Sequence, residues 1–178
     1  MFTVTAHRTE DLDASQRAAI IAVCVAAFND PEFEALFSYI PSGGLHFVGS
    51  VAGKVVSHAV ATTRWVQPEG LPPLRTAYVD AVATDPARQG RGCGSAVLRA
   101  LARGVAATHQ IACLETGRVG FYERLGWERW RGPRAGRGED GFIPTPDEQN
   151  ILILRLPNTP PLDLDGLLTI ECQKSRIW

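Results

Sequence analysis

Thr84-Asp-Pro-Ala-Arg-Gln-Gly-Arg-Gly-Cys-Gly-Ser-Ala-Val-Leu-Arg-Ala-Leu-Ala-Arg-Gly104 places three alternate glycines, Gly90, Gly92 and Gly94, directly before an apolar helical pattern. The first turn of a helix has amide groups without partners inside the helix, and the helix dipole adds partial positive charge there. Glycines leave this backbone uncovered. The stretch therefore predicts a binding site for an anion, most naturally a phosphate.

Several interpretations of this loop compete. A dinucleotide-binding fingerprint needs G-x-G-x-x-G inside a βαβ unit, whereas this stretch has G-x-G-x-G and no such unit around it. A Walker loop needs G-K-[ST], which the stretch does not contain. A cradle for the pyrophosphate of coenzyme A remains, beside the alternative of a plain glycine-rich turn.

The composition is that of an ordinary globular protein, with 178 residues, 45% of them hydrophobic and 21% charged. This length fits one domain, residues 1–178. The formal net charge of −1 gives no basic field for nucleic acid, and we expect no membrane segment and no signal peptide. The four cysteines are far apart without a C-x-x-C pair, so we expect reduced thiols, no metal site and a cytoplasmic location.

Hydrophobic periodicity and turn residues predict a mixed α/β sheet with helices. Residues 131–141 are rich in Gly and Arg and are expected to form a mobile loop, and residues 52–54 are expected to turn a hairpin. The expected strands are 2–5, 45–51, 55–66, 74–83, 111–114, 127–130, 151–156 and 167–172, and the expected helices are 11–28, 31–39, 95–107 and 119–125.

Three segments together resemble the Gcn5-related N-acetyltransferases (GNAT): Gln89-Gly-Arg-Gly-Cys-Gly94, Tyr78-Val-Asp-Ala-Val-Ala-Thr-Asp-Pro86 and Phe121-Tyr-Glu-Arg-Leu-Gly-Trp127. The resemblance implies the GNAT fold, a mixed central sheet with splayed parallel strands, here 74–83 and 111–114, flanked by helices. It also implies acetyl-CoA as the cofactor. The implied cofactor contacts are Val82, Thr84, Gln89, Gly90, Arg91, Gly92, Cys93 and Gly94.

A longer collinear set of segments resembles the bacterial aminoglycoside 2′-N-acetyltransferases. The set comprises Gly43-Gly-Leu-His46, Ser57-His-Ala59, Tyr78-Val-Asp80, Tyr122 with Gly126-Trp127, Thr145-Pro-Asp147 and Trp178. This resemblance implies direct transfer of the acetyl group from acetyl-CoA to the 2′-amine of an antibiotic, which confers resistance, and a homodimer. Neither a metal nor a covalent acyl-enzyme is expected.

The resemblance also implies the catalytic groups. Tyr122 matches the tyrosine beside the thioester sulfur, and a phenol, with an ordinary pKa of about 10, can protonate a departing thiolate. Asp80 matches a glutamate that accepts the amine proton through water, and it is one methylene shorter. Alternatively, Tyr122 is a core aromatic residue and Asp80 a solvated strand residue. His46 and His58 are expected to be core residues rather than catalysts.

The substrate pocket implied by the resemblance is acidic, because aminoglycosides are polycations. Its implied members are Asp30, Asp80, Cys113, Asp147 and the carboxylate of Trp178.

The related enzymes carry two aspartates near their ends, where this chain has Lys174 and Arg176. These cations should disfavour drugs with many ammonium groups and favour an aminoglycoside with its own carboxylate, bound by Arg176. Kasugamycin is an aminoglycoside of this kind and is the expected substrate. The alternative is that Arg176 points into solvent and does not contact the substrate. An acetyltransferase of another small amine or of a protein N-terminus, and a non-catalytic acyl-CoA-binding module, remain as alternatives.

Overall fold

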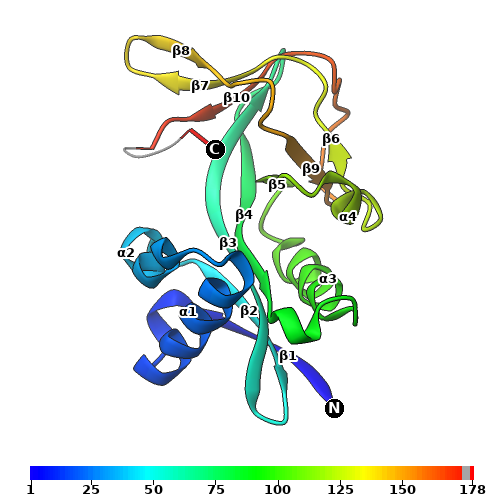
Figure 1. The fold of residues 1–178 in the computed structure, drawn as a ribbon. Coiled ribbons are helices and arrows are strands. Elements are labelled where there is room, and N and C mark those ends of the chain that lie inside the picture. The colour runs from blue at the N-terminus through cyan, green and yellow to red at the C-terminus, as the bar shows by residue number, and fades with distance from the viewer. Residues whose placement is uncertain (174–176) are drawn as a thin grey trace. The chain divides into compact units, whose positions relative to one another are not determined.

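The computed structural model describes residues 1–173 and 177–178 of the chain (Figure 1). The chain divides into two compact units. The first comprises Met1–Thr62 and Val79–Val105, and the second comprises Thr63–Tyr78 and Ala106–Trp178. Strands β3 and β4 contribute residues to both units.

The elements of the first unit begin with a strand and a helical pair, continue with a hairpin and end with a long helix. They are β1 (Phe2–Arg8), η1 (Thr9–Asp11), α1 (Ala14–Phe28), η2 (Pro31–Ala35), α2 (Leu36–Tyr39), β2 (Leu45–Val51), the first part of β3 (Lys54–Pro68), the last part of β4 (Leu74–Thr84), η3 (Pro86–Arg88) and α3 (Cys93–Val105). The predicted strand 45–51 is confirmed at both ends.

The sheet of the first unit is built around the β2–β3 hairpin. Strand β1 pairs antiparallel with β2 from Phe2↔Val51 to Arg8↔Leu45, and β2 pairs antiparallel with β3. Ala52 and Gly53 form the turn with φ angles of 49° and 77°. Two consecutive positive φ angles match the right-handed twist of the strands, and the predicted hairpin is confirmed.

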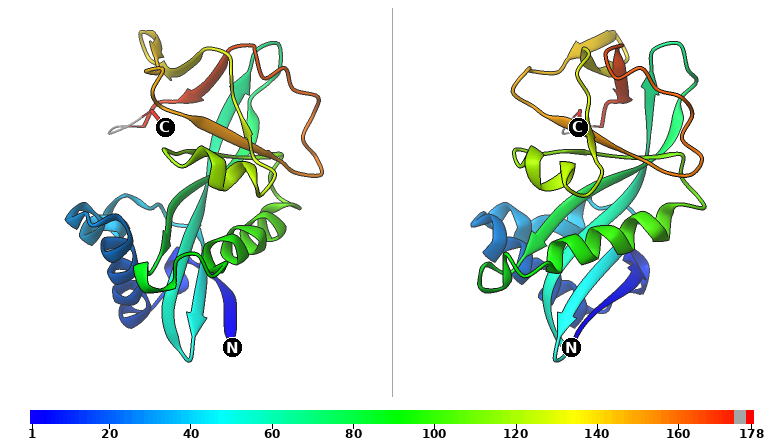
Figure 2. Two further views of the ribbon diagram at one scale, coloured as in Figure 1. Left: turned by 45° about the vertical axis from the view of Figure 1, so that its right-hand side comes forward. Right: turned by 90° about the vertical axis from the view of Figure 1, so that its right-hand side faces the viewer.

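Helices cover both faces of this sheet, as Figure 2 shows. Val48 of β2 packs into a core cluster with residues of α1 and α2, whereas the neighbouring Phe47 packs on the opposite side against Gly104 of α3. A Cβ on Gly104 would lie 2.6 Å from the Phe47 ring, so the glycine lets α3 approach β2 closely. Alternate residues of one strand therefore hold helices on opposite faces.

Helix α1 begins at Ala14, three residues after the predicted start, and Asp13 is its N-cap. Asp13 Oδ1 accepts the backbone N–H of Gln16 at 2.8 Å, and the Gln16 side chain accepts the Asp13 N–H at 2.9 Å. This capping box satisfies two amides of the first turn. Asn29 ends the helix with a φ of 52°, a conformation that asparagine tolerates better than most residues.

The second unit contains the outer strands of the sheet and one short helix. Its strands run in the order β6-β9-β5-β4-β3-β10-β7-β8. Its core contains Tyr78, Cys113, Trp130 and Trp178, all buried. Beside the remaining parts of β3 and β4, its elements are β5 (Ile111–Glu115), α4 (Val119–Glu123), β6 (Glu128–Arg129), β7 (Arg134–Gly138), β8 (Gly141–Pro144), β9 (Ile151–Arg155) and β10 (Leu168–Glu171).

The prediction of a mobile loop over 131–141 is wrong. This segment contains strand β7, which pairs parallel with β10 from Leu168↔Arg134 to Glu171↔Arg137, and it begins β8. Its Gly136 is required by packing, because a Cβ there would lie 2.5 Å from Cys172 Sγ. Arg137 donates to Thr169 Oγ1 at 2.7 Å, so the polar composition serves hydrogen bonds within the sheet.

The sheet is mixed, because β4–β5 and β7–β10 are parallel while the β1–β2, β2–β3 and β5–β9 pairs are antiparallel. The α/β fold class is confirmed. Among the described residues, none of the helices combines the length and the apolar character that crossing a bilayer requires.

Candidate functional site

The glycine stretch forms a loop between η3 and α3 in the first unit. Gly90 and Gly92 have φ angles of 72° and 80°, a region that residues with a Cβ rarely adopt. An added Cβ at either position would meet no atom within 4 Å. The loop therefore presents backbone to open space, and side chains there would project into the volume that a ligand would take.

The loop is tied to the end of β4. Gln89 Nε2 donates to the Thr84 carbonyl at 3.2 Å, and the Thr84 hydroxyl lies 2.9 Å from Ser57 Oγ. Asp85 caps η3 by accepting the Ala87 N–H at 2.9 Å. These contacts hold the predicted cofactor residues Thr84 and Gln89 in one fixed turn.

Helix α3 provides the amide groups behind the loop. Its first hydrogen bond runs from the Ala96 N–H to the Gly92 carbonyl at 2.9 Å, so the amides of Cys93 and Gly94 lie in the turn where helix geometry supplies no acceptor. The Cys93 side chain is buried and Arg91 is exposed. Cys93 can therefore take part through its amide, whereas Arg91 can take part through its side chain.

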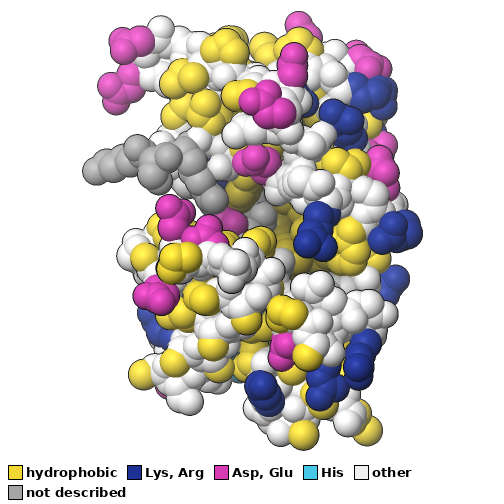
Figure 3. Space-filling model, in the orientation of Figure 1, with side chains coloured by type: hydrophobic (Ala, Val, Ile, Leu, Met, Phe, Trp, Pro, Cys, Tyr) yellow, Lys and Arg dark blue, Asp and Glu magenta, His cyan; other side chains and the backbone are white. Residues whose placement is uncertain are grey.

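Charge is segregated on the first unit. In Figure 3, drawn in the orientation of Figure 1, more Lys and Arg side chains are visible on the side of α3, and more Asp and Glu side chains are visible on the side of α1 and α2, with exceptions on both sides. Helix α3 carries the exposed Arg99 and Arg103, and η2 carries the exposed Glu32 and Glu34. The cationic side suits a phosphate-bearing ligand.

Asp80 is half-buried on β4, next to an irregular backbone position. Its Oδ1 accepts the Ala81 N–H at 2.8 Å. The next residue, Ala81, has a φ of 48°. Asp80, Val82 and Thr84 are partly exposed, while the residues between them are buried. The three predicted site residues of β4 thus share the accessible positions of the strand.

Asp30 lies at the start of η2 in the same unit. Its Oδ1 accepts the Glu32 N–H at 2.9 Å, so one carboxylate oxygen caps the short helix. Phe28 and Phe33 stack beside it with ring centroids 4.4 Å apart. The substrate role of Asp30 stays a prediction, since this cap is a sufficient structural reason for an aspartate.

Tyr122 belongs to the second unit, on α4, and is 6% exposed. Phe121 and Trp127 contact its ring edge-on, with centroids 5.0 Å and 5.7 Å away. The Tyr122 carbonyl accepts the N–H groups of Leu125 and Trp127 at 2.8 Å and 3.2 Å. The ring and the main chain of this tyrosine are therefore both held firmly.

Cys113 lies in the middle of β5, paired with Tyr78 on one side and Ile153 on the other. Its side chain is fully buried in the second core cluster, and burial raises the pKa of its thiol to about 12. The thiol is therefore protonated near neutral pH and shielded from solvent. The predicted substrate contact at Cys113 is one that only its main chain can make.

The remaining predicted substrate residues lie near the end of the chain. Asp147 is exposed and accepts from Arg134 Nη2 at 3.4 Å. Trp178 is 3% exposed, and its indole N–H donates to Thr145 Oγ1. The indole is thus a core group, while the predicted role of its carboxylate is untested. Arg176 lies outside the described residues.

One cluster of charges was not predicted. Arg64 of β3 is 1% exposed, and its guanidinium donates to Glu171 Oε1 at 3.2 Å and lies 4.9 Å from the Tyr78 ring centroid. Arg137 lies 3.8 Å from the same carboxylate. Among the described residues, Arg64 Nη1 is buried without an acceptor. The sequence signals this cluster only through an arginine that stands among the apolar residues of a predicted strand.

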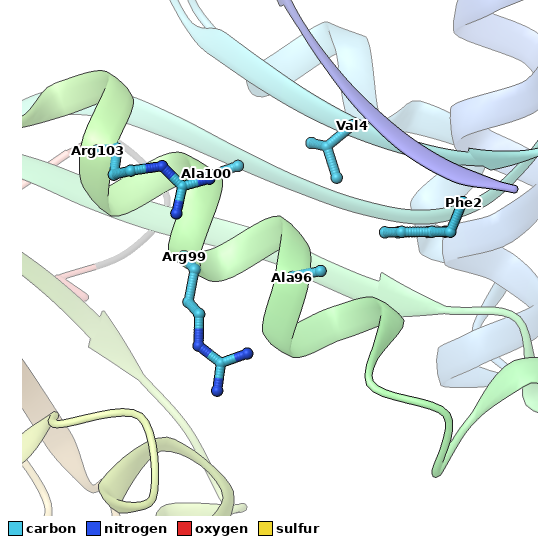
Figure 4. A pocket seen from close by; sticks show the side chains of 6 residues that line it. All are labelled: Phe2, Val4, Ala96, Arg99, Ala100 and Arg103. Atoms are coloured by element: carbon cyan, nitrogen blue, oxygen red, sulfur yellow. The ribbon is translucent and has the colours of Figure 1, made fainter.

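A hollow of about 400 Å³ lies between α3 and β1 in the first unit (Figure 4). Ala96 and Ala100 point toward Phe2 and Val4, and Arg99 and Arg103 flank them. None of the predicted site residues lines this hollow.

The comparisons with known proteins agree with this geometry. Residues 7–130, more than half of the chain, match the family described as acetyltransferase (GNAT) domain. The chain is similar to an aminoglycoside 2′-N-acetyltransferase from Mycolicibacterium fortuitum, with 27% identity over 184 residues that cover 100% of this chain and 93% of that protein.

Solved structures share the fold. A GNAT-family N-acetyltransferase from Escherichia coli, solved in complex with CoA, has a TM-score of 0.65 at 14% identity and covers 96% of this chain and 91% of its own. Eis1 from Mycobacterium abscessus has a TM-score of 0.62 at 18% identity and covers 76% of this chain, which spans only 32% of that protein. At such identities the likeness shows the fold alone.

Proposed function

Because the chain belongs to the family of acetyltransferase (GNAT) domains, whose members use acetyl-CoA, we propose that it N-acetylates the 2′-amino group of an aminoglycoside. In this proposal residues 1–178 act as one acetyltransferase domain. Two observations together support the proposal. The chain has the open glycine loop, and it is similar over its whole length to an aminoglycoside 2′-N-acetyltransferase. The transfer is direct, without an acyl-enzyme.

The residues of the loop fit a pyrophosphate. Gly90 and Gly92 leave open the space that a Cβ would fill, and the amides of Cys93 and Gly94 supply donors at the positive end of the α3 dipole. Arg91 supplies a charged donor, and Val82 and Thr84 supply main-chain groups for the rest of the cofactor. When bound, acetyl-CoA supplies an acetyl group activated as a thioester.

Asp80 is the proposed proton acceptor. In this proposal a water bridges the Asp80 carboxylate, which accepts the Ala81 N–H, to the amine of the substrate. The half-buried position of Asp80 on β4 allows such a water. The shorter side chain of aspartate, compared with glutamate, makes the bridging water part of the proposal.

Tyr122 is the proposed proton donor to the departing thiolate. The edge-on contacts of Phe121 and Trp127 fix the ring plane, so the hydroxyl direction is set before any ligand binds. A fixed donor does not have to be reoriented during the reaction, which is how positioned acids contribute to the rate.

One cluster of the second unit has more guanidinium groups than carboxylates. Arg64 and Arg137 share the single carboxylate of Glu171, and Arg64 retains a buried N–H without an acceptor among the described residues. We propose that the substrate binds beside this cluster, where the excess of guanidinium groups repels additional ammonium groups and attracts a carboxylate. We therefore propose kasugamycin as a better substrate than gentamicin or tobramycin, with Asp30, Asp147, Arg176, the carboxylate of Trp178 and the main chain of Cys113 as further substrate contacts.

Steady-state kinetics with kasugamycin, gentamicin and tobramycin test this proposal. We expect a higher kcat/KM for kasugamycin in the wild type, and a loss with Arg176→Ala on the order of tenfold, the size of one lost charged hydrogen bond. Arg129→Ala, at an exposed arginine of β6, is the matched control and should change nothing. A higher kcat/KM for gentamicin would overturn the choice of substrate, and an unchanged Arg176→Ala would remove Arg176 from the site.

A homodimer and a cytoplasmic location complete the proposal. Phe142 and Ile143 are 62% and 49% exposed on the edge strand β8, and they offer apolar surface for a second copy. Multi-angle light scattering of the wild type and of Phe142→Ser tests this point, with a dimer expected for the wild type and a weakened one for the variant.

A further inference from the structure

A chain of buried hydrogen bonds crosses the first unit from η1 to β4. Thr9 Oγ1 lies 3.0 Å from His46 Nε2, His46 Nδ1 lies 2.9 Å from His58 Nε2, and His58 Nδ1 lies 2.9 Å from the Ala81 carbonyl oxygen. His46 and His58 are both 0% exposed. No step of the proposed mechanism uses either imidazole.

The direction of this chain is fixed by its last member. A carbonyl oxygen can only accept, so His58 Nδ1 carries a hydrogen and donates it to Ala81. His58 Nε2 is then the acceptor in the neutral ring, and it accepts from His46 Nδ1–H. Thr9 Oγ1 lies within hydrogen-bonding distance of both His46 Nε2, at 3.0 Å, and the Gly44 carbonyl oxygen, at 3.2 Å, so its one hydrogen is shared between these two acceptors. The carbonyl of Ala81 therefore fixes one tautomer for each neutral ring, and both nitrogens of His58 have partners in it.

The surroundings keep both rings neutral. Burial lowers the pKa of His46 to about 3 and that of His58 to about 4. The charged and titratable groups that face the pair are His7, Arg17, Cys24 and Asp80, and burial raises the pKa of the Cys24 thiol to about 12. Near neutral pH, the pair acts through its hydrogen bonds and carries no charge.

Ala81 is held in a conformation that it does not favour. Its φ of 48° is in the left-handed region, where a Cβ crowds the following carbonyl, and nothing in an alanine side chain compensates for that cost. Hydrogen bonds fix the peptide groups on both sides of Ala81. Its carbonyl accepts from His58, and its N–H donates to Asp80 Oδ1. The position of the Asp80 carboxylate thus depends on the main chain that His58 holds.

We propose that His58, with its tautomer set by His46, is a positioning residue that holds Ala81 in its left-handed conformation and so orients the Asp80 carboxylate. The proposal rests on the role of Asp80 in the proposed function. It assigns no proton transfer to either histidine.

Two amide side chains of different length test the hydrogen bond to Ala81. His58→Asn places an N–H near the former Nδ1 and should retain kcat within about threefold, whereas His58→Gln places it near the former Nε2. Since His58→Gln leaves the Ala81 carbonyl without its donor, kcat should fall on the order of ten- to a hundredfold. The KM for acetyl-CoA should not change in either variant, which a general loss of structure would not produce.

A second substitution tests the conformational step. Glycine adopts a φ of 48° without the cost that alanine has. Ala81→Gly in the His58→Gln background should therefore recover part of the lost kcat. Val60→Ala, at a residue of β3 that is equally buried, controls for destabilisation and should leave kcat unchanged.

Failure of this proposal is distinguishable from failure of the proposed base. NMR measures the φ of Ala81 directly through the coupling between its amide and α protons, with no substrate present. We expect the wild-type coupling in His58→Asn and an altered one in His58→Gln. An unaltered Ala81 coupling in His58→Gln, or an unchanged kcat in that variant, would overturn the proposal. An altered coupling together with full activity in Asp80→Asn would instead refute Asp80 as the base.

Discussion

Replacing Gly92 by aspartate tests the cofactor loop. The backbone at Gly92 has a φ of 80°, and an added Cβ meets no protein atom within 4 Å, so the substitution introduces backbone strain and a charge but no clash. The strain is about 1–2 kcal/mol. A carboxylate roughly 5 Å from one phosphate charge adds about 1 kcal/mol of repulsion in bulk water and about 3 kcal/mol at an effective dielectric constant of 20. The repulsion alone weakens binding roughly 5- to 150-fold for each phosphate charge.

Gly53→Asp is the matched control for this experiment. Gly53 has a φ of 77° and equally open space, but it lies in the β2–β3 turn. Both variants should unfold at similar, slightly lower temperatures, because the backbone cost is the same. Isothermal titration calorimetry with acetyl-CoA should show a large loss of affinity for Gly92→Asp and none for Gly53→Asp. Equal affinity in the two variants would refute the assignment of the loop.

Three further predictions concern catalysis and stability. Tyr122→Phe should lower kcat by about ten- to ten-thousandfold, the range for a lost general acid, with unchanged acetyl-CoA affinity by calorimetry. Trp178→Ala should lower the free energy of unfolding by about 3–5 kcal/mol in urea titrations, since the 3% exposed indole packs in the core and bonds Thr145, and a loss below about 1 kcal/mol would contradict that packing. In the folded protein, the pKa of His46 is lowered to about 3 and that of His58 to about 4. Below about pH 6.5 the unfolded chain therefore binds more protons than the folded protein, and the free energy of unfolding falls as the pH drops toward 4. The loss should be about 2 kcal/mol per histidine between pH 6.5 and 5, and the double variant to asparagine should not show it.

Local signals predicted the elements that local interactions determine. The apolar segment 45–51 and the turn at Ala52-Gly53 predicted the hairpin, whereas the helix predicted from residue 11 begins at Ala14. The uncovered backbone of the loop could be predicted because glycine is the residue type that adopts positive φ angles and has no side chain. The open glycine loop before α3 was therefore accessible from the sequence, while the roles of its residues in binding the cofactor stay predictions.

Long-range partners account for what was missed. Strand β7 was predicted as a loop because the partners of its Arg137, Thr169 and Trp65, are far away in sequence. Arg64 is buried only because Glu171, 107 residues later, accepts its hydrogen bonds.

The left-handed φ of Ala81 has no signal in the sequence, because alanine rarely adopts it. The proximity of His46 and His58 could have been predicted from the hairpin. In the predicted hairpin, Val48↔His58 and His46↔Val60 are paired, which makes the two histidines diagonal neighbours on one face of the sheet.

The position of acetylation on the substrate tests the central proposal most directly. The protein is incubated with acetyl-CoA and kasugamycin, the product is isolated, and its acetyl group is located by mass spectrometry and two-dimensional NMR. The account predicts a product with a single acetyl group on the 2′-amino nitrogen, formed by the wild type and strongly reduced with Tyr122→Phe. An acetyl group on any other nitrogen, or an unmodified drug with kasugamycin, gentamicin and tobramycin alike while acetyl-CoA binds normally, would contradict it.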